Sequence, residues 1–222
     1  MHVWTTSAPP FYKNGFVVAC ERTRQAVVID PGDDVEEQLA IVRREAVAVT
    51  MILLTHAHLD HVTGVAAAKA ALGVARNGAR QQVDVWLHRE DLFLYEGAVQ
   101  QGRMFGLNVQ PQPRPDRFYA EGEPLAFGDY VVDVRHTPGH SPGGVCLAIG
   151  RSGEEERDLF VGDTLFAGSI GRTDLPGGDL DTLLASIRNE LFVYPDATVV
   201  HSGHGPDTTI GQERRSNPFL SS

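Results

Sequence analysis

The run Thr50–Thr55 (TMILLT) constrains the fold of this chain more than any other feature of its sequence. It is short and almost wholly apolar, and the polar hexapeptide HAHLDH follows it at once, at residues 56–61. A strand with apolar residues at consecutive positions is buried on both faces of its sheet, because both faces are covered by other layers. The sequence therefore predicts a layered α/β architecture.

Short apolar or β-branched runs alternate with segments of helical period along most of the chain. Strands are predicted at residues 16–20, 26–30, 50–55, 84–88, 131–135, 145–149, 158–162 and 198–200. Helices are predicted from residue 33 onward and at 62–72, 90–99 and 180–193, the last opened by Asp179. At the first helix, Asp33 and Asp34 precede Glu36 and Glu37 in a carboxylate version of a capping box. Residues 151–157 are interpreted as a hairpin turn and the Pro-rich residues 111–115 as a loop.

Composition excludes several classes of protein. The 222 residues are 42% hydrophobic, enough to bury a core, and we expect one domain over residues 1–222. The formal charge of −10 would repel a nucleic acid, so no such partner is expected. The N-terminus has no signal-peptide pattern and no apolar run reaches the roughly 18 residues of a membrane span, which predicts a cytoplasmic protein. Cys20 and Cys146 lie in apolar runs and are predicted to be buried free thiols.

The hexapeptide HAHLDH is the strongest functional signal. It places three imidazoles and a carboxylate within six residues, and a chance match to this pattern in such a chain has odds on the order of one in a thousand. Three further clusters, each at the end of a predicted strand, are TPGHSPGG at 137–144, GDT at 162–164 and SGHGP at 202–206. Gly and Pro fix sharp turns that direct the His or Asp side chain out of the sheet edge. A polar, solvated turn explains one such cluster, but four together favour a metal site.

Together, HAHLDH, TPGH, GDTLF and GHGP resemble the metal-binding motifs of the metallo-β-lactamase superfamily, whose fold is a four-layer αββα sandwich. Residues 166–174 (FAGSIGRTD) and 217–220 (NPFL) resemble the short bacterial glyoxalase II-like hydrolases. The resemblance implies two divalent metal ions, zinc in the first place and iron or manganese as alternatives. It implies the following ligands: His56, His58 and His140 for the first ion, Asp60, His61 and His204 for the second, and Asp163 bridging both.

The chemistry of such a pair of ions fits a hydrolase. Two metals about 3.5–4 Å apart share one water, lower its pKa toward ~7 and hold the hydroxide that attacks a carbonyl. The chain then needs no serine or cysteine nucleophile, and it contains no Gly-x-Ser-x-Gly motif. Asp60 is expected to orient the hydroxide or carry a proton while it binds metal. A thiolate leaving group needs little acid assistance, which suits thioester hydrolysis.

The resemblance implies a small-molecule thioester substrate such as a hydroxyacyl-glutathione. Full-length glyoxalase II enzymes bind glutathione with a C-terminal helical domain, whereas only 18 residues follow His204 here. We therefore expect a single metallo-β-lactamase-like domain without that helical domain. Glutathione as the thiol carrier follows from the resemblance alone.

Other functions remain open at this stage. A persulfide dioxygenase of the same fold would hold one iron with His56, His140 and Asp163, a two-histidine, one-carboxylate set with open positions. The continuation LPGGD at 175–179 resembles the short hydrolases more, which places the dioxygenase second. A structural metal module is disfavoured because its site would be closed. A β-lactamase is disfavoured because the chain has no signal-peptide pattern.

The remaining candidate residues have structural explanations as well as functional ones. His2, His88, His136 and His201 are interpreted as structural, although His136 and His201 precede the metal motifs. Arg172 and Asp174 are interpreted mainly as a local ion pair, with substrate contact as the alternative. For Tyr95, Arg103, Met104 and Phe105, a substrate-covering segment and a helix end packed on the core explain the pattern equally. The sequence assigns no substrate-binding residue and no oligomeric state.

Overall fold

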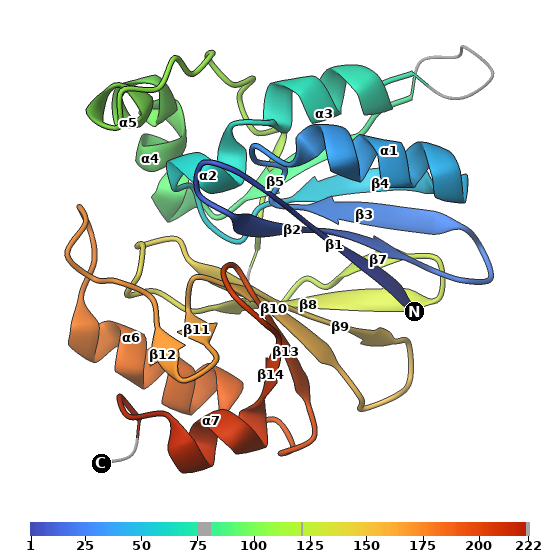
Figure 1. Cartoon of the computed structure of the whole chain (residues 1–222). Helices are drawn as coiled ribbons and strands as arrows, with labels where there is room; N and C mark the ends of the chain where they lie inside the picture. Colours follow the sequence, from blue (N-terminus) through green and yellow to red (C-terminus); the bar gives the residue numbers. More distant parts are fainter. Residues whose placement is uncertain (75–80, 121, 221–222) are drawn as a thin grey trace. The chain divides into compact units, whose positions relative to one another are not determined.

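The computed structural model describes residues 1–74, 81–120 and 122–220. The chain divides into two compact units. The first consists of residues 1–119 with 127–129, and the second of residues 120–126 with 130–222. Each unit contains a six-stranded sheet with helices packed on it (Figure 1).

The sheet of the first unit has the strand order β1-β2-β3-β4-β5-β6. Its strands are β1 (His2–Ala8), β2 (Lys13–Ala19), β3 (Gln25–Ile29), β4 (Ala48–Leu53), β5 (Asp84–Leu87) and β6 (Arg117–Phe118). Strands β1 to β3 pair antiparallel, whereas β3 to β6 run parallel. Because parallel strands end at the same edge of a sheet, the segments after β3, β4 and β5 begin side by side.

The helices of the first unit cover one face of this sheet. They are α1 (Val35–Glu45), α2 (Leu59–Val62), α3 (Val65–Leu72), the 3₁₀ turn η1 (Arg89–Asp91), α4 (Leu92–Glu96) and α5 (Ala98–Met104). Figure 1 shows α1 and α3 lying along β3 and β4. Val35, Leu39 and Val42 of α1 lie in the core with the strands, at the helical spacing that the sequence predicts.

The start of α1 differs from the sequence prediction. Asp34 is the N-cap residue, but its side chain makes no capping hydrogen bond. It faces the buried Lys13 instead, whose Nζ donates to Asp34 Oδ1 at 2.8 Å, while Thr6 Oγ1 donates to Oδ2. A buried ammonium group must be paired, and this requirement outweighs capping. The capping-box prediction is therefore wrong.

Two predicted helices differ from the structure near glycines. The helix predicted at 62–72 begins only at Val65, as α3, and a separate short helix, α2, ends at Val62, because Gly64 between them lies against the main chain that follows β3. A Cβ at Gly64 would lie 2.4 Å from the carbonyl oxygen of Gly32, and the Gly64 amide donates to the Pro31 carbonyl at 2.9 Å. The segment predicted at 90–99 becomes η1, α4 and α5, with Gly97 between the last two.

The sheet of the second unit has the order β14-β13-β10-β9-β8-β7. Its strands are β7 (Leu125–Phe127), β8 (Tyr130–His136), β9 (Val145–Arg151), β10 (Asp158–Gly162), β13 (Val199–Ser202) and β14 (Thr208–Thr209), beside a separate hairpin of β11 (Leu165–Phe166) and β12 (Ser169–Ile170). β9 is antiparallel to β8 and β10, and β13 is parallel to β10. Strands β8, β10 and β13 therefore end at the same edge.

The second unit has its own helices and apolar core. Its helices are α6 (Leu180–Ser186), the π-helical turn η2 (Ile187–Leu191) and α7 (Ile210–Ser216). Asp179 caps α6, as predicted, and accepts from the Thr182 amide at 2.8 Å. Leu183, Ile187 and Ile210 pack with the strands, and Figure 1 shows α6 and α7 on one face of the sheet.

The other local predictions can be compared directly. The predicted hairpin turn at 151–157 links β9 to β10, and the Pro-rich residues 111–115 form a loop inside the first unit. Cys20 and Cys146 are both fully buried free thiols, as predicted. Over the described ranges, every helix is too short or too polar to span a bilayer.

Candidate metal centre

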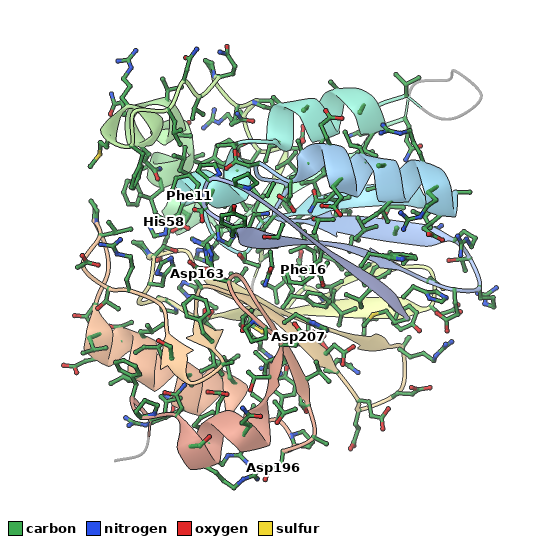
Figure 2. All side chains as sticks on the ribbon, viewed as in Figure 1. Phe11, Phe16, His58, Asp163, Asp196 and Asp207 are labelled. Carbon is green, nitrogen blue, oxygen red and sulfur yellow. The ribbon has the colours of Figure 1, made fainter. Side chains whose placement is uncertain are left out.

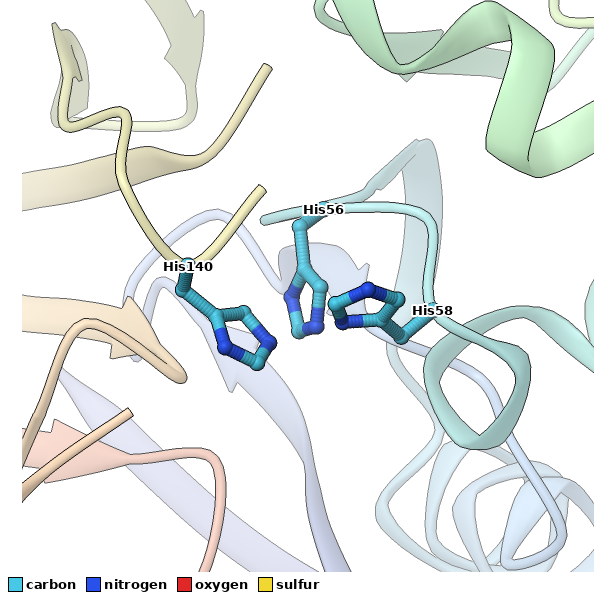
Figure 3. A group of neighbouring side chains, drawn as sticks. All are labelled: His56, His58 and His140. Carbon is cyan, nitrogen blue, oxygen red and sulfur yellow. The ribbon is translucent and has the colours of Figure 1, made fainter. Parts of the chain in front are cut away.

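The first group of metal-ligand candidates lies in the segment from Thr55 to His61, named here the histidine loop, which follows β4 and runs into α2. His56, His58 and His61 are all buried. The rings of His56 and His58 meet edge to face with 4.9 Å between their centroids (Figure 3). Asp60 remains partly exposed, with its Oδ2 at 3.8 Å from His61 Nε2. The structure thus brings the four polar side chains of HAHLDH together at the end of β4.

Asp30, directly after β3, holds His61 in place. The residue has a positive φ of 48° and is buried, and its carboxylate accepts from the Thr55 amide at 2.7 Å and from the Thr55 hydroxyl at 2.6 Å. His61 Nδ1 lies 2.9 Å from Asp30 Oδ2. An ionised carboxylate can only accept, so the proton of His61 is on Nδ1 and the lone pair is on Nε2.

Hydrogen bonding also determines which ring nitrogen of His56 carries the proton. The Thr55 hydroxyl gives its proton to Asp30, so at its 3.2 Å contact with His56 Nδ1 the hydroxyl oxygen accepts. His56 therefore also carries its proton on Nδ1 and its lone pair on Nε2. Ligand atoms of Asp30, His56 and His61 all lie within 4.8 Å of one another. This tautomer is the one that metal-binding histidines adopt when a neighbour accepts from the other ring nitrogen.

The main chain of the histidine loop is fixed by buried contacts. The Ala57 amide donates to the buried Asp91 carboxylate at 2.9 Å. A Cβ at Gly32 would lie 1.8 Å from the carbonyl oxygen of Asp60, so only glycine fits where the chain after β3 passes α2. Neither Asp30 nor Asp91 is among the residues that the sequence motifs indicate. The signal for Asp30 was its place at a strand end before Pro31.

The second group lies in the second unit and consists of His140, Asp163 and His204, named here the Asp163 cluster. They follow β8, β10 and β13, the three strands that end at one edge, and Figure 2 labels Asp163. Asp163 Oδ2 lies 3.6 Å from His140 Nε2 and 3.6 Å from His204 Nε2. One carboxylate oxygen is therefore shared between two imidazole nitrogens of the type that binds metal.

Hydrogen bonding and close packing hold the residues of the Asp163 cluster in place. His140 Nδ1 donates to the Arg172 carbonyl at 2.8 Å, which leaves the His140 lone pair on Nε2, facing Asp163. His140 also appears in Figure 3. A Cβ at Gly171 would lie 1.8 Å from the Asp163 carbonyl oxygen, and one at Gly203 would lie 2.2 Å from Asp163 Oδ1. Both glycines are needed for the backbone to approach this aspartate.

The other histidines make contacts of a structural kind. His136 Nε2 donates to the Pro142 carbonyl at 2.8 Å, which braces the turn that carries His140. His201 lies between Asp207 (Figure 2), at 2.9 Å, and Asp158, at 3.9 Å. Burial opposes the charged form of His201, but hydrogen bonding and the charges of both carboxylates outweigh it and raise the pKa of the imidazole.

The residues that remained ambiguous in the sequence fall into two groups. Arg172 and Asp174 form an exposed ion pair with contacts of 2.7 and 2.6 Å, and its hydrogen bonds lower the pKa of Asp174 to about 2. Tyr95 is buried in the core of the first unit, and its hydroxyl donates to the Pro113 carbonyl at 2.7 Å. Arg103, Met104 and Phe105 are exposed at the end of α5.

A sequence model of the metallo-beta-lactamase superfamily matches residues 8–204. The chain belongs to this superfamily. The metallo-β-lactamase fold predicted from the motifs is therefore confirmed, and the His and Asp clusters are those of a metal-dependent hydrolase of the superfamily. The imidazole and carboxylate donors of both groups are of the types that bind divalent metal ions, and the lone pairs of His56, His61 and His140 are on Nε2.

A curated relative and three solved structures are similar over nearly the whole chain. Hydroxyacylglutathione hydrolase GloC of Haemophilus influenzae is 40% identical over 201 residues, which cover 90% of this chain and 89% of the relative. BLEG-1 B3 metallo-beta-lactamase has a TM-score of 0.87 at 37% identity and full coverage of both chains. TTHA1623 in a di-iron-bound form has a TM-score of 0.81 at 40% identity, covering 98% of this chain and 100% of the other. ETHE1 from Myxococcus xanthus has a TM-score of 0.75 at 27% identity, covering 98% and 84%.

Proposed function

We propose that this protein is a dinuclear metal hydrolase of small-molecule thioesters. The observation that supports two metals is the position of Asp163, whose Oδ2 lies at equal distance from the Nε2 atoms of two different imidazoles. A carboxylate placed in this way suits a bridge between two ions. A single-metal site that uses His140 would leave His204 without a ligand role.

In this proposal the histidine loop and the Asp163 cluster form one metal centre. His56, His58 and His140 bind the first ion, Asp60, His61 and His204 bind the second, and Asp163 bridges them. Both groups lie within the region that matches the superfamily. When bound, the two ions supply a hydroxide at neutral pH and polarise the carbonyl of the substrate.

The chain's own side chains set up this chemistry. Asp30 and Thr55 keep the protons of His61 and His56 on Nδ1, so Nε2 is ready to bind without losing a proton first. Asp60, the most exposed of the loop's polar side chains that would bind metal, holds or moves the proton of the attacking water. His56 and His61 are buried, so they would keep water away from the side of the centre that they line.

The substrate assignment rests on the relative from Haemophilus influenzae, whose name states that it hydrolyses hydroxyacylglutathione. We propose a hydroxyacyl thioester as substrate, with glutathione as the thiol. Zinc is the first candidate for the metal, and the di-iron form of TTHA1623 makes iron a serious alternative. We place the enzyme in the cytoplasm.

A second candidate is a persulfide dioxygenase with a single iron bound by His56, His140 and Asp163. The similarity to ETHE1 keeps this function open. In that case the iron ligands would be supported by neighbouring residues that do not themselves bind iron, namely His58, Asp60, His61 and His204.

The deciding experiment measures metal content per chain in protein purified without added metal. Turnover of S-lactoylglutathione and oxygen uptake with glutathione persulfide are measured on the same sample. About two metals with thioester turnover support the hydrolase. One iron with oxygen uptake refutes it and establishes the dioxygenase.

Variants of two ligands sharpen this result. His58→Ala and Asp163→Ala are each expected to abolish thioester hydrolysis, because each removes a ligand that the dinuclear centre needs. The expected loss in kcat is at least about 100-fold. Thioester hydrolysis retained in Asp163→Ala contradicts the dinuclear mechanism, and a mild effect of His58→Ala on oxygen uptake is expected only for the single iron.

A further inference from the structure

Glu213 on α7 is a fully buried carboxylate outside the candidate metal ligands. Its Oε2 accepts from the Gly168 amide and from Asn217 Nδ2, both at 2.8 Å, and its Oε1 accepts from the Thr208 hydroxyl at 2.5 Å. A buried carboxylate is costly unless donors compensate it, and three donors do so here. Two of the three lie on other segments, so the carboxylate fastens α7 to them.

One of those segments is the hairpin of β11 and β12. Gly168 lies in its turn, with a positive φ of 70°, and gives its amide proton to Glu213. The next residue, Ser169, accepts from Asn217 Nδ2 at 3.0 Å through its carbonyl. Asn217 is also fully buried, and its amide group thus connects the hairpin to Glu213. The turn of the hairpin is held by an amide and a carbonyl at once.

The same hairpin and the two residues after it contact every residue of the Asp163 cluster. Phe166 meets the ring of His204 edge to face, with 6.1 Å between centroids. Gly171 lies against the main chain of Asp163, where no Cβ would fit. The next carbonyl along the chain, that of Arg172, accepts from His140 Nδ1.

We propose that Glu213 and Asn217 are positioning residues of the metal centre. They act through the hairpin, which sets the ring orientation of His140 and His204 and the approach of the backbone to Asp163. This inference rests on the proposed function, because it takes these three residues to be metal ligands. It also gives a role to the NPFL segment, whose Asn217 had none in the catalytic assignment.

Three variants separate positioning from general stability. Glu213→Leu keeps the volume but removes both acceptor oxygens. Glu213→Gln restores the pattern, because the amide oxygen can accept from Gly168 and Asn217 while the amide nitrogen donates to Thr208. Thr208→Val is the matched control, since it removes one hydrogen bond from the same carboxylate but leaves the hairpin contacts intact. Asn217→Ala is the second test variant if Glu213→Leu does not fold.

The readouts are cobalt(II) affinity, the visible spectrum of the cobalt-loaded protein and the exchange rate of the His140 Nδ1 proton in the full chain before metal is added. Glu213→Leu is expected to lower metal affinity about 10- to 100-fold, as loss of a partner outside the ligands commonly does. It should also shift the cobalt spectrum and raise the exchange rate of the His140 Nδ1 proton, because the hairpin would hold the Arg172 carbonyl less firmly. Glu213→Gln and Thr208→Val should stay close to wild type in all three.

Unchanged affinity, spectrum and exchange in a folded Glu213→Leu or Asn217→Ala protein overturn the proposal. So does an equal loss in Thr208→Val, because the effect would then follow stability. A wild-type protein that binds fewer than two metals and hydrolyses no thioester refutes the proposed function instead. In that case the exchange rate at His140, which requires no metal, still tests the positioning role.

Discussion

Asp30→Asn provides the sharpest test of how the histidine loop is prepared for metal. Asp30 accepts from the Thr55 amide, the Thr55 hydroxyl and His61 Nδ1. Asparagine has only one acceptor oxygen, so its NH₂ group must face some of these donors. If the oxygen stays with the Thr55 amide, the NH₂ faces His61 Nδ1, and the proton of His61 must move to Nε2.

The size of the effect follows from this change of tautomer. His61 can then bind metal through Nε2 only if its proton returns to Nδ1, where the N–H would face the NH₂ donor of the asparagine. Loss of a partner outside the ligands commonly costs about 10- to 100-fold in metal affinity, which is about 1.4–2.8 kcal/mol. In the opposite amide orientation, the NH₂ group of the asparagine faces the Thr55 amide, which is also a donor. Because this site is buried, that orientation would lower the free energy of unfolding by about 1–3 kcal/mol.

The assay is a competition titration of the metal with a chromophoric chelator, beside urea unfolding of the metal-free protein. If Asp30→Asn binds metal as tightly as wild type, the tautomer argument is refuted.

Two further predictions concern the second unit. Gly171→Ala should abolish metal binding and lower the free energy of unfolding by about 1–3 kcal/mol, because the new Cβ would overlap the Asp163 carbonyl. Metal analysis measures the first effect and urea unfolding the second. A Gly171→Ala protein that retains its full metal content would contradict this prediction. The raised pKa of His201 means that the folded state binds its proton more tightly than the unfolded state, whose pKa is ~6.5. Its stabilising contribution is complete below ~6.5 and is lost as the pH rises through the raised pKa, so urea unfolding should show a decline there that is smaller in Asp207→Asn. An equal decline in both proteins would exclude His201 as its source.

Much of the fold could be predicted from local sequence pattern. The strands that became β2, β3, β9 and β10 are buried along most of their length, and such strands show as apolar runs. Strand β4 is also an apolar run, although it is buried only at Val49, Ile52 and Leu53. Strand β1 was missed because it lies at a sheet edge and its side chains are mostly exposed or half-buried. Strand β14 has two residues and α7 has seven, too short for a periodic pattern to stand out.

The candidate site divides in the same way. The motifs identified residues whose types alone indicate metal binding, such as His56 and His140. They did not identify Asp30 or Glu213, because the partners that give these carboxylates a role lie 31 and 45 residues away in the chain, at His61 and Gly168. The capping prediction at Asp34 failed for a related reason: the competing partner, Lys13, lies 21 residues earlier in the chain, on β2.

The contact between Gly32 and Gly64 affects how this protein can be diversified. The carbonyl of Gly32 approaches the α-carbon of Gly64, and Gly32 itself lies against the carbonyl of Asp60. At these two contacts the histidine loop and the chain after it pack against main chain, whereas Asp30 and Asp91 hold the loop through their side chains. A combinatorial library could vary exposed neighbours such as Glu36 and Glu37, whereas a side chain at either glycine would collide with main chain, so most variants of Gly32 or Gly64 would not fold.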